Sequence, residues 1–146
     1  MARAYASHAV FVAVLKHMTR AKKLFLVVED FEDSRFMMRR LLEMAGYEVL
    51  EATDGEQAVE LAAAQHPAII LMDLSLPKLD GLEATRRIRE TRGLKGVPIV
   101  AVSAHDSIES RNEALEAGCN EYVTKPIDFD RLNQLLQRFI GSNRAR

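Results

Sequence analysis

The sequence predicts an α/β fold in which one doubly wound sheet of five parallel strands carries helices on both faces. The first observation is that short β-type apolar runs alternate five times with segments of helical periodicity, joined by short connections. The second is that three of these runs are apolar throughout and two are mixed, as expected of three central and two edge strands. The strand order 2-1-3-4-5 places strands 2 and 5 at the edges and agrees with this count.

The first strand is predicted over residues 24–28, a continuous apolar run typical of a strand covered on both faces. Asp33 or Ser34 is a candidate cap for the helix that follows, and Gly46 is its expected stop. Residues 47–51 alternate between polar and apolar side chains, which predicts a half-exposed edge strand. Two apolar stripes run along the helix predicted before this strand, namely Met37, Leu41 and Met44, and Met38, Leu42 and Ala45. We expect the three methionines, Met37, Met38 and Met44, to fill the core.

The second helix is predicted to begin at Asp54 and to end before Pro67. A second buried strand follows over residues 68–72, and Asp80 introduces the third helix. Residues 97–102 form the third buried strand of the prediction, with a proline near its start, where it is tolerated.

The fourth helix is expected between a cap at Ser107 and a stop at Gly118, before a second edge strand over residues 119–123. Asp128 caps the last helix. The apolar face of that helix consists of Leu132, Leu135, Leu136, Phe139 and Ile140. Five strand–helix units joined by right-handed crossovers predict a flavodoxin-like (βα)5 architecture.

The composition is that of a globular protein and excludes several functional classes. Of the 146 residues, 48% are apolar and 28% are charged, which is ordinary for one folded domain. The 20 basic and 21 acidic side chains leave a net charge of −1, which argues against nucleic-acid binding and membrane-surface binding, since both need a basic excess. A single cysteine excludes an internal disulfide and a cysteine-based zinc site, so we expect a cytoplasmic protein.

Residues 1–22 differ in pattern from the rest of the chain. Their longest apolar run, residues 9–15, is far shorter than the roughly 20 residues of a bilayer-spanning helix, and no signal-peptide cleavage pattern follows it. We interpret residues 1–22 as an N-terminal extension, either disordered or preceding a native start at Met18, and residues 23–146 as the single domain.

Polar residues stand at the ends of four of the five predicted strands. Glu29 and Asp30 follow the first strand, Asp73 ends the third, Ser103 ends the fourth, and Lys125 follows the fifth. The carboxyl ends of parallel strands meet at one edge of the sheet, where ligands bind. Two carboxylates ~4 Å apart repel each other by about 4 kcal/mol at an effective dielectric constant near 20. Three of them together therefore predict compensation by Lys125 and by a hard divalent cation, most naturally Mg²⁺.

This group of residues suits the transfer of a phosphoryl group to a carboxylate. Asp73 is the candidate nucleophile because it ends a central strand between the acidic pair and the lysine. Glu29 and Asp30 would hold the metal, directly or through water. The ammonium group of Lys125 and the hydroxyl group of Ser103 would contact the phosphoryl oxygens.

Four motifs, taken together and in this order, resemble the receiver domain of two-component response regulators (CheY-like), and the resemblance covers residues 23 to about 140. The motifs are Val27-Val28-Glu29-Asp30, then Leu71-Met72-Asp73-Leu74-Ser75-Leu76-Pro77 with Asp80-Gly81, then Val102-Ser103-Ala104, and finally Tyr122-Val123-Thr124-Lys125-Pro126.

The resemblance implies that Asp73 accepts a phosphoryl group from a histidine kinase or a histidine phosphotransfer protein. It further implies that Mg²⁺ is bound by Asp30, by Asp73 and by the backbone carbonyl group of Ser75, with Glu29 acting through water.

The resemblance also assigns Ser103 and Lys125 to the phosphoryl oxygens and suggests a cis Lys125–Pro126 peptide bond. Phosphorylation would draw Ser103 toward the new oxygens, and Tyr122 would rotate into the space that this leaves. His105, two positions after Ser103, is a candidate modulator of dephosphorylation or simply an exposed loop residue.

The expected protein is thus a stand-alone receiver domain that switches a protein-binding face and catalyses only its own phosphorylation and dephosphorylation. The alternative is a phosphorelay shuttle that passes the phosphoryl group onward. The downstream protein is unidentified, and the chain is expected to be a monomer or a phosphorylation-dependent dimer.

Two other protein classes fit the sequence less well. A phosphatase or phosphomutase of the haloacid dehalogenase type also uses a strand-end aspartate, but it needs a second acid two residues later, where this chain has Ser75. A flavodoxin-like FMN carrier needs a Ser/Thr/Gly-rich phosphate loop after the first strand, where residues 29–33 are mostly acidic.

Overall fold

The computed structural model describes residues 22–141, so the predicted N-terminal extension lies almost wholly outside the described residues. One parallel sheet has the order β2-β1-β3-β4-β5, which confirms the predicted topology. The strands are β1 (Leu24–Val28), β2 (Glu48–Ala52), β3 (Ile69–Asp73), β4 (Ile99–Ser103) and β5 (Glu121–Thr124). The helices are α2 (Glu32–Met44), α3 (Gly55–Gln65), α4 (Gly81–Glu90), α5 (Ile108–Ala117) and α6 (Phe129–Gly141).

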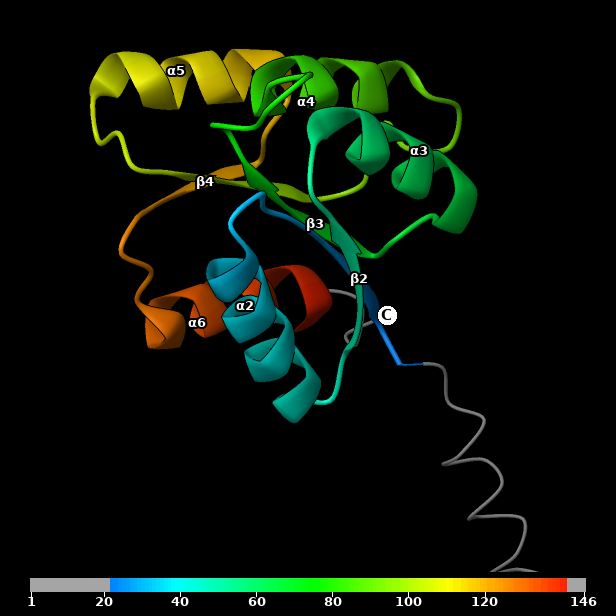
Figure 1. Ribbon diagram of the computed structural model, residues 1–146, viewed down its shortest axis with the longest axis vertical. Coiled ribbons are helices and arrows are strands. Elements are labelled where there is room, and N and C mark those ends of the chain that lie inside the picture. The colour runs from blue at the N-terminus through cyan, green and yellow to red at the C-terminus, as the bar shows by residue number, and fades with distance from the viewer. Residues whose placement is uncertain (1–21, 142–146) are drawn as a thin grey trace, which may run out of the picture.

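The sheet is the middle layer of three. Helices α3, α4 and α5 cover one face, and α2 and α6 cover the other (Figure 1). Each face has its own apolar core, and the central strands β1, β3 and β4 contribute to both. The two edge strands are only partly buried, as their mixed sequences predict. No helix among residues 22–141 is long and apolar enough to cross a membrane.

The register of the sheet brings the strand ends to one edge. Val28, the last residue of β1, pairs with Met72, so the acidic pair that follows β1 lies beside the end of β3. Ser103, the last residue of β4, pairs with Thr124, which immediately precedes Lys125. Residues far apart in the sequence are therefore neighbours at the carboxyl edge.

The predicted caps Ser107 and Asp128 are confirmed, and the two aspartates predicted to introduce helices, Asp54 and Asp80, are caps as well. Each of these side chains accepts a hydrogen bond from a backbone N–H group in the first turn of its helix, which satisfies a donor that the helix itself leaves unpaired. The four caps are Asp54, Asp80, Ser107 and Asp128.

The predicted start of α2 is wrong by two or three residues. The helix begins at Glu32 with Phe31 in the N-cap position, and no side chain caps it. Asp33 and Ser34 therefore lie inside the first turn. Two carboxylates in that turn, those of Glu32 and Asp33, interact favourably with the helix dipole and take the place of a side-chain cap.

Only one of the two apolar stripes of α2 packs against the sheet. Met38 and Leu42 belong to the core, whereas Met37 and Met44 are 56% and 78% exposed. A helix that lies on one face of a sheet buries a single stripe, and α6 occupies the rest of this face. The prediction that the stripe of Met37 and Met44 packs is therefore wrong.

The first residue of α4 lies directly against the end of β3. A Cβ atom added at Gly81 would overlap the backbone carbonyl oxygen of Asp73 and lie 2.7 Å from the Cα atom of Leu74. Both neighbours belong to the backbone and cannot turn aside. A glycine here allows the N-terminus of α4 to touch the segment that carries Asp73.

We expect Gly81→Ala to lower the free energy of unfolding by about 3 kcal/mol, the upper part of the range for overpacking. The thermal midpoint should fall by about 9 °C for a domain of this size. Thermal unfolding followed by circular dichroism measures the change. The matched control is Gly96→Ala, because a Cβ atom there meets nothing within 4 Å, and its effect should stay within about 0.5 kcal/mol. Equal stability of the two variants would contradict the close approach.

Candidate functional site

Three carboxylates meet at the carboxyl edge of the sheet, as predicted. Glu29, Asp30 and Asp73 each offer an oxygen atom, and these atoms lie within 4.8 Å of one another. Glu29 and Asp73 are buried, with exposed fractions of 7% and 4%, whereas Asp30 is exposed. The register of β1 against β3 forces the two buried acids together.

Lys125 reaches the cluster from the other side. Its Nζ atom lies 3.1 Å from Oδ2 of Asp73 and 3.2 Å from Oε1 of Glu29, so one ammonium group bridges the two buried carboxylates. The Lys125–Pro126 peptide bond is cis, as the motif suggests. Burial alone would lower the pKa of Lys125, but attraction to Asp73 and then to Glu29 outweighs it and raises this pKa.

The negative charge of the cluster is only partly compensated. Burial, reinforced by the neighbouring Asp73, raises the pKa of Glu29 to about 7, although Lys125 acts in the opposite direction. Oε2 of Glu29 is buried and has no hydrogen-bond partner among the described residues. The three carboxylates offer oxygen ligands, and a single ammonium group offsets only part of their charge, so the cluster fits a hard divalent cation such as Mg²⁺.

Both oxygens of Asp73 have a donor. Oδ2 accepts from Lys125, and Oδ1 accepts the backbone N–H group of Ser75 at 2.9 Å. Ser75 is exposed in the connection after β3. These two contacts fix the rotation of the Asp73 carboxylate at the mouth of the site.

Ser103 and Tyr122 are connected through the backbone of His105. The buried Oγ atom of Ser103 accepts the backbone N–H group of His105 at 3.1 Å. The hydroxyl group of Tyr122 donates to the carbonyl oxygen of His105 at 2.6 Å. The imidazole of His105 is exposed, and its modulating role stays a prediction.

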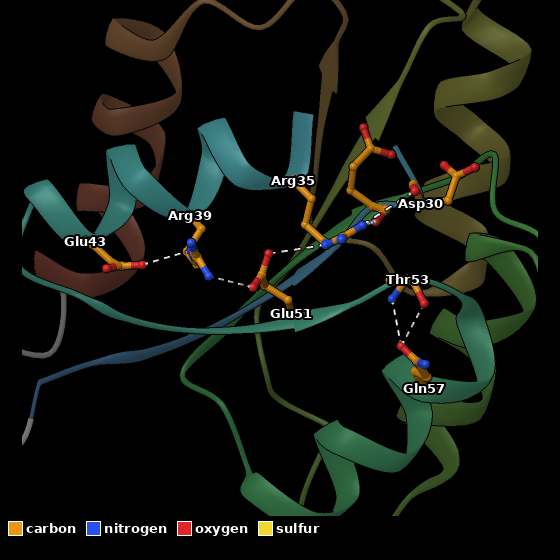
Figure 2. A network of polar contacts seen from close by, with 8 residues as sticks. Asp30, Arg35, Arg39, Glu43, Glu51, Thr53 and Gln57 are labelled. Atoms are coloured by element: carbon orange, nitrogen blue, oxygen red, sulfur yellow. Dashed lines mark hydrogen bonds and ion pairs between the residues drawn. The ribbon is translucent and has the colours of Figure 1, made fainter. Parts of the chain in front are cut away.

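The sequence patterns above do not single out Arg35, which contacts the backbone of the acidic pair. Its guanidinium group donates to the carbonyl oxygen of Glu29 at 3.0 Å and forms an ion pair with Glu51 at 3.2 Å (Figure 2). The only sequence signal is an arginine one helical turn into α2. That signal carries no information about Glu51, which belongs to the neighbouring strand β2.

A model of the response regulator receiver domain family matches residues 25–137. The chain belongs to this family. It is 34% identical over 119 residues to the polar-differentiation response regulator DivK of Brucella ovis, covering 82% of this chain and 97% of that protein.

Solved structures agree with this assignment. The receiver domain of the sensor histidine kinase PA1611 from Pseudomonas aeruginosa PAO1, which has a magnesium ion in its active-site cleft, is 40% identical, with a TM-score of 0.78 and coverage of 83% and 99% of the two chains. The receiver domain of Ssk1 from Saccharomyces cerevisiae, in complex with the histidine phosphotransfer protein Ypd1, is 30% identical, with a TM-score of 0.76 and coverage of 82% and 89%.

This receiver domain is therefore a module of two-component signalling. Receiver domains are generally switches rather than enzymes, and the relative from Pseudomonas aeruginosa holds a magnesium ion in its active-site cleft. Its acidic cluster lies where the strand order changes direction, the usual ligand position of a doubly wound sheet.

We expect Glu29→Gln to stabilise the metal-free receiver domain by about 2 kcal/mol at pH 7.5, since each unit of pKa shift corresponds to about 1.4 kcal/mol and solvent screens part of it. The substitution keeps the shape of the side chain and removes a buried charge. Urea unfolding in the presence of a chelator measures the effect. The control, Asp30→Asn, removes an exposed charge and should change stability by less than half as much. A Glu29→Gln variant less stable than the native chain would contradict the charge argument.

Proposed function

We propose that this receiver domain accepts a phosphoryl group on Asp73 from a histidine kinase or a histidine phosphotransfer protein in a Mg²⁺-dependent reaction. We further propose that phosphorylation changes the protein-binding face formed by α5, β5 and α6. The observation that carries the proposal is the position of Asp73, a buried carboxylate 3.1 Å from the Lys125 ammonium and beside two further acids.

Asp30, Asp73 and the backbone carbonyl group of Ser75 would hold the metal, with Glu29 acting through water. The bound ion supplies positive charge for the oxygens of the incoming phosphoryl group. The magnesium-containing relative from Pseudomonas aeruginosa supports this assignment, and so does the uncompensated charge around Glu29.

The remaining chemistry belongs to residues of the chain. The Asp73 carboxylate attacks phosphorus, and the bond from phosphorus to the donor histidine breaks as the new P–O bond forms. The ammonium group of Lys125 already donates a hydrogen bond to Asp73. After the transfer it can donate to a phosphoryl oxygen instead and neutralise part of its negative charge. The hydroxyl group of Ser103 keeps its own proton for a second phosphoryl oxygen, because it only accepts from His105.

The same hydroxyl group connects the reaction to the switch. When Ser103 moves toward a phosphoryl oxygen, its bond to the His105 N–H group draws the connection after β4 with it. The carbonyl group of His105 then carries the change to the Tyr122 hydroxyl group on β5. Phosphorylation shifts the population of states because only one arrangement satisfies all of these bonds together.

The phosphodonor has an apolar surface available beside Asp73. A pocket between α2 and the connection from β5 to α6 opens next to Asp73 and Lys125, and Met37, Ile127 and Phe129 contribute to its wall. The complex of the yeast relative with a histidine phosphotransfer protein supports a protein donor. The single, buried cysteine is in keeping with a cytoplasmic location for this exchange.

We expect acetyl phosphate with Mg²⁺ to add one phosphoryl group to the native chain, and Asp73→Asn to abolish the adduct because the amide is not a nucleophile. Intact-protein mass spectrometry under acid-quenched conditions measures it. Asp106→Asn, which removes an exposed carboxylate paired with Arg111, is the control and should be phosphorylated like the native chain. An undiminished adduct in Asp73→Asn would overturn the proposed function.

We expect Tyr122→Phe to leave phosphorylation of Asp73 unchanged but to reduce the response of residues 104–107 by half or more, because the bond to the His105 carbonyl group is lost. The readout is the amide chemical-shift change on adding beryllofluoride and Mg²⁺, with Tyr47→Phe as the control hydroxyl deletion far from this bond. A native-like response in Tyr122→Phe would show that the switch does not use this contact.

A further inference from the structure

Asp30 is the least constrained acid of the cluster. Its carboxylate is exposed, and no hydrogen bond or ion pair holds it among the residues that the structure describes. Its carboxylate lies with those of Glu29 and Asp73, whose ligand oxygens are all within 4.8 Å of one another, so repulsion between like charges opposes this position. Something other than the side chain of Asp30 must therefore keep this segment in place in the absence of metal.

Arg35 supplies that constraint through the backbone. Its NH1 atom donates to the carbonyl oxygen of Glu29 at 3.0 Å, and the carbonyl oxygen of Asp30 lies at 3.5 Å, the long limit of a hydrogen bond. Its own backbone N–H group donates to Phe31 at 3.0 Å. The acidic segment is thus tied to the first turn of α2 at successive residues.

The guanidinium group is itself held in position from β2. Its Nε atom lies 3.2 Å from Oε1 of Glu51, and the Arg35 side chain is only 16% exposed. Glu51 also pairs with Arg39 at 3.1 Å, and Arg39 pairs with Glu43 at 3.2 Å (Figure 2). Two arginines and two glutamates leave the network without net charge, so Arg35 holds the loop without strongly repelling a nearby cation.

We propose that Arg35 is a positioning residue for the metal site: it fixes the Glu29–Asp30 backbone before Mg²⁺ arrives and thereby raises the affinity for the ion. This inference rests on the proposed function of the acidic cluster. Outer residues that orient metal ligands typically change affinity by 10- to 100-fold when they are removed. Since Arg35 acts on the backbone of an exposed ligand, the lower end of that range is the expected effect.

The test measures Mg²⁺ binding to the full chain by isothermal titration calorimetry at constant ionic strength. Arg35→Met should raise the Kd about tenfold. Arg35→Lys should raise it at least about fivefold, because one ammonium group cannot hold a carbonyl oxygen and Glu51 together. The lysine variant keeps the charge and the aliphatic stem, so it separates geometry from charge and from any folding defect of the methionine variant.

Arg39→Met is the matched control. It removes the same charge from the same network one turn further along α2 and leaves the bond to the Glu29 carbonyl group intact. Its Kd for Mg²⁺ should stay within about twofold of the native value. Equal losses in the Arg35→Met and Arg39→Met variants would assign the effect to charge or helix stability and would overturn the inference.

A second measurement reports positioning directly. In the metal-free protein, Arg35→Met should lower the backbone order parameters of Asp30 and Phe31, measured by NMR relaxation, whereas Arg39→Met should not. At saturating Mg²⁺, the rate of phosphorylation by acetyl phosphate in Arg35→Met should return to within about twofold of native, because bound metal orders the segment by itself.

The outcomes separate the two proposals. A native chain that binds Mg²⁺ and takes the phosphoryl group, beside an Arg35→Met or Arg35→Lys variant of unchanged affinity, overturns this inference alone. Unchanged backbone order parameters at Asp30 in the metal-free Arg35→Met variant would likewise overturn this inference and leave the proposed function standing. A native chain that binds no Mg²⁺ overturns the proposed function and this inference with it.

Discussion

Repulsion between the buried carboxylates of Glu29 and Asp73 is the constraint on which the rest of the site depends. The parallel pairing of β1 with β3 places the two carboxylates side by side. Both are buried, so water screens the repulsion between them only weakly. Lys125 offsets part of the repulsion, but burial and then the neighbouring Asp73 still raise the pKa of Glu29. The uncompensated carboxylate charge destabilises the metal-free fold and at the same time attracts cations to the carboxyl edge of the sheet. Such a cost in stability is expected at a functional site.

Much of this arrangement can be predicted from the sequence because it follows from local patterns and general rules of topology. Alternating periodicities indicate the elements, apolar content separates central from edge strands, and parallel order brings Asp73, Ser103 and Lys125 to one edge. Four of the five strands lie one or two residues later than expected, because a strand continues as long as its backbone pairs with a neighbour, whatever the side chain. Asp73 is an example, since it is polar and still pairs with Val102.

The features that sequence patterns miss depend on distances in three dimensions. Met37 and Met38 are adjacent and chemically identical, and only the position of α2 on the sheet decides which one is buried. Arg35 resembles any surface arginine of a first helical turn until β2 brings Glu51 beside it. Both cases concern contacts between elements, for which a single chain carries no periodic signal.

The absence of a side chain at Gly81 has a mechanical consequence. The backbone at the start of α4 packs directly on the carbonyl group of Asp73 with no side chain between them, so close packing couples the helix to the end of β3. A shift of the Asp73 backbone would move the N-terminus of α4, and a hydrogen-bonded helix would carry that movement to its other end. The first place that can absorb it is the link to β4, where Gly93 adopts a left-handed conformation of φ +85°. A displacement of the end of β3 would therefore reach α4 directly, and the link that contains Gly93 would be the first segment able to absorb it.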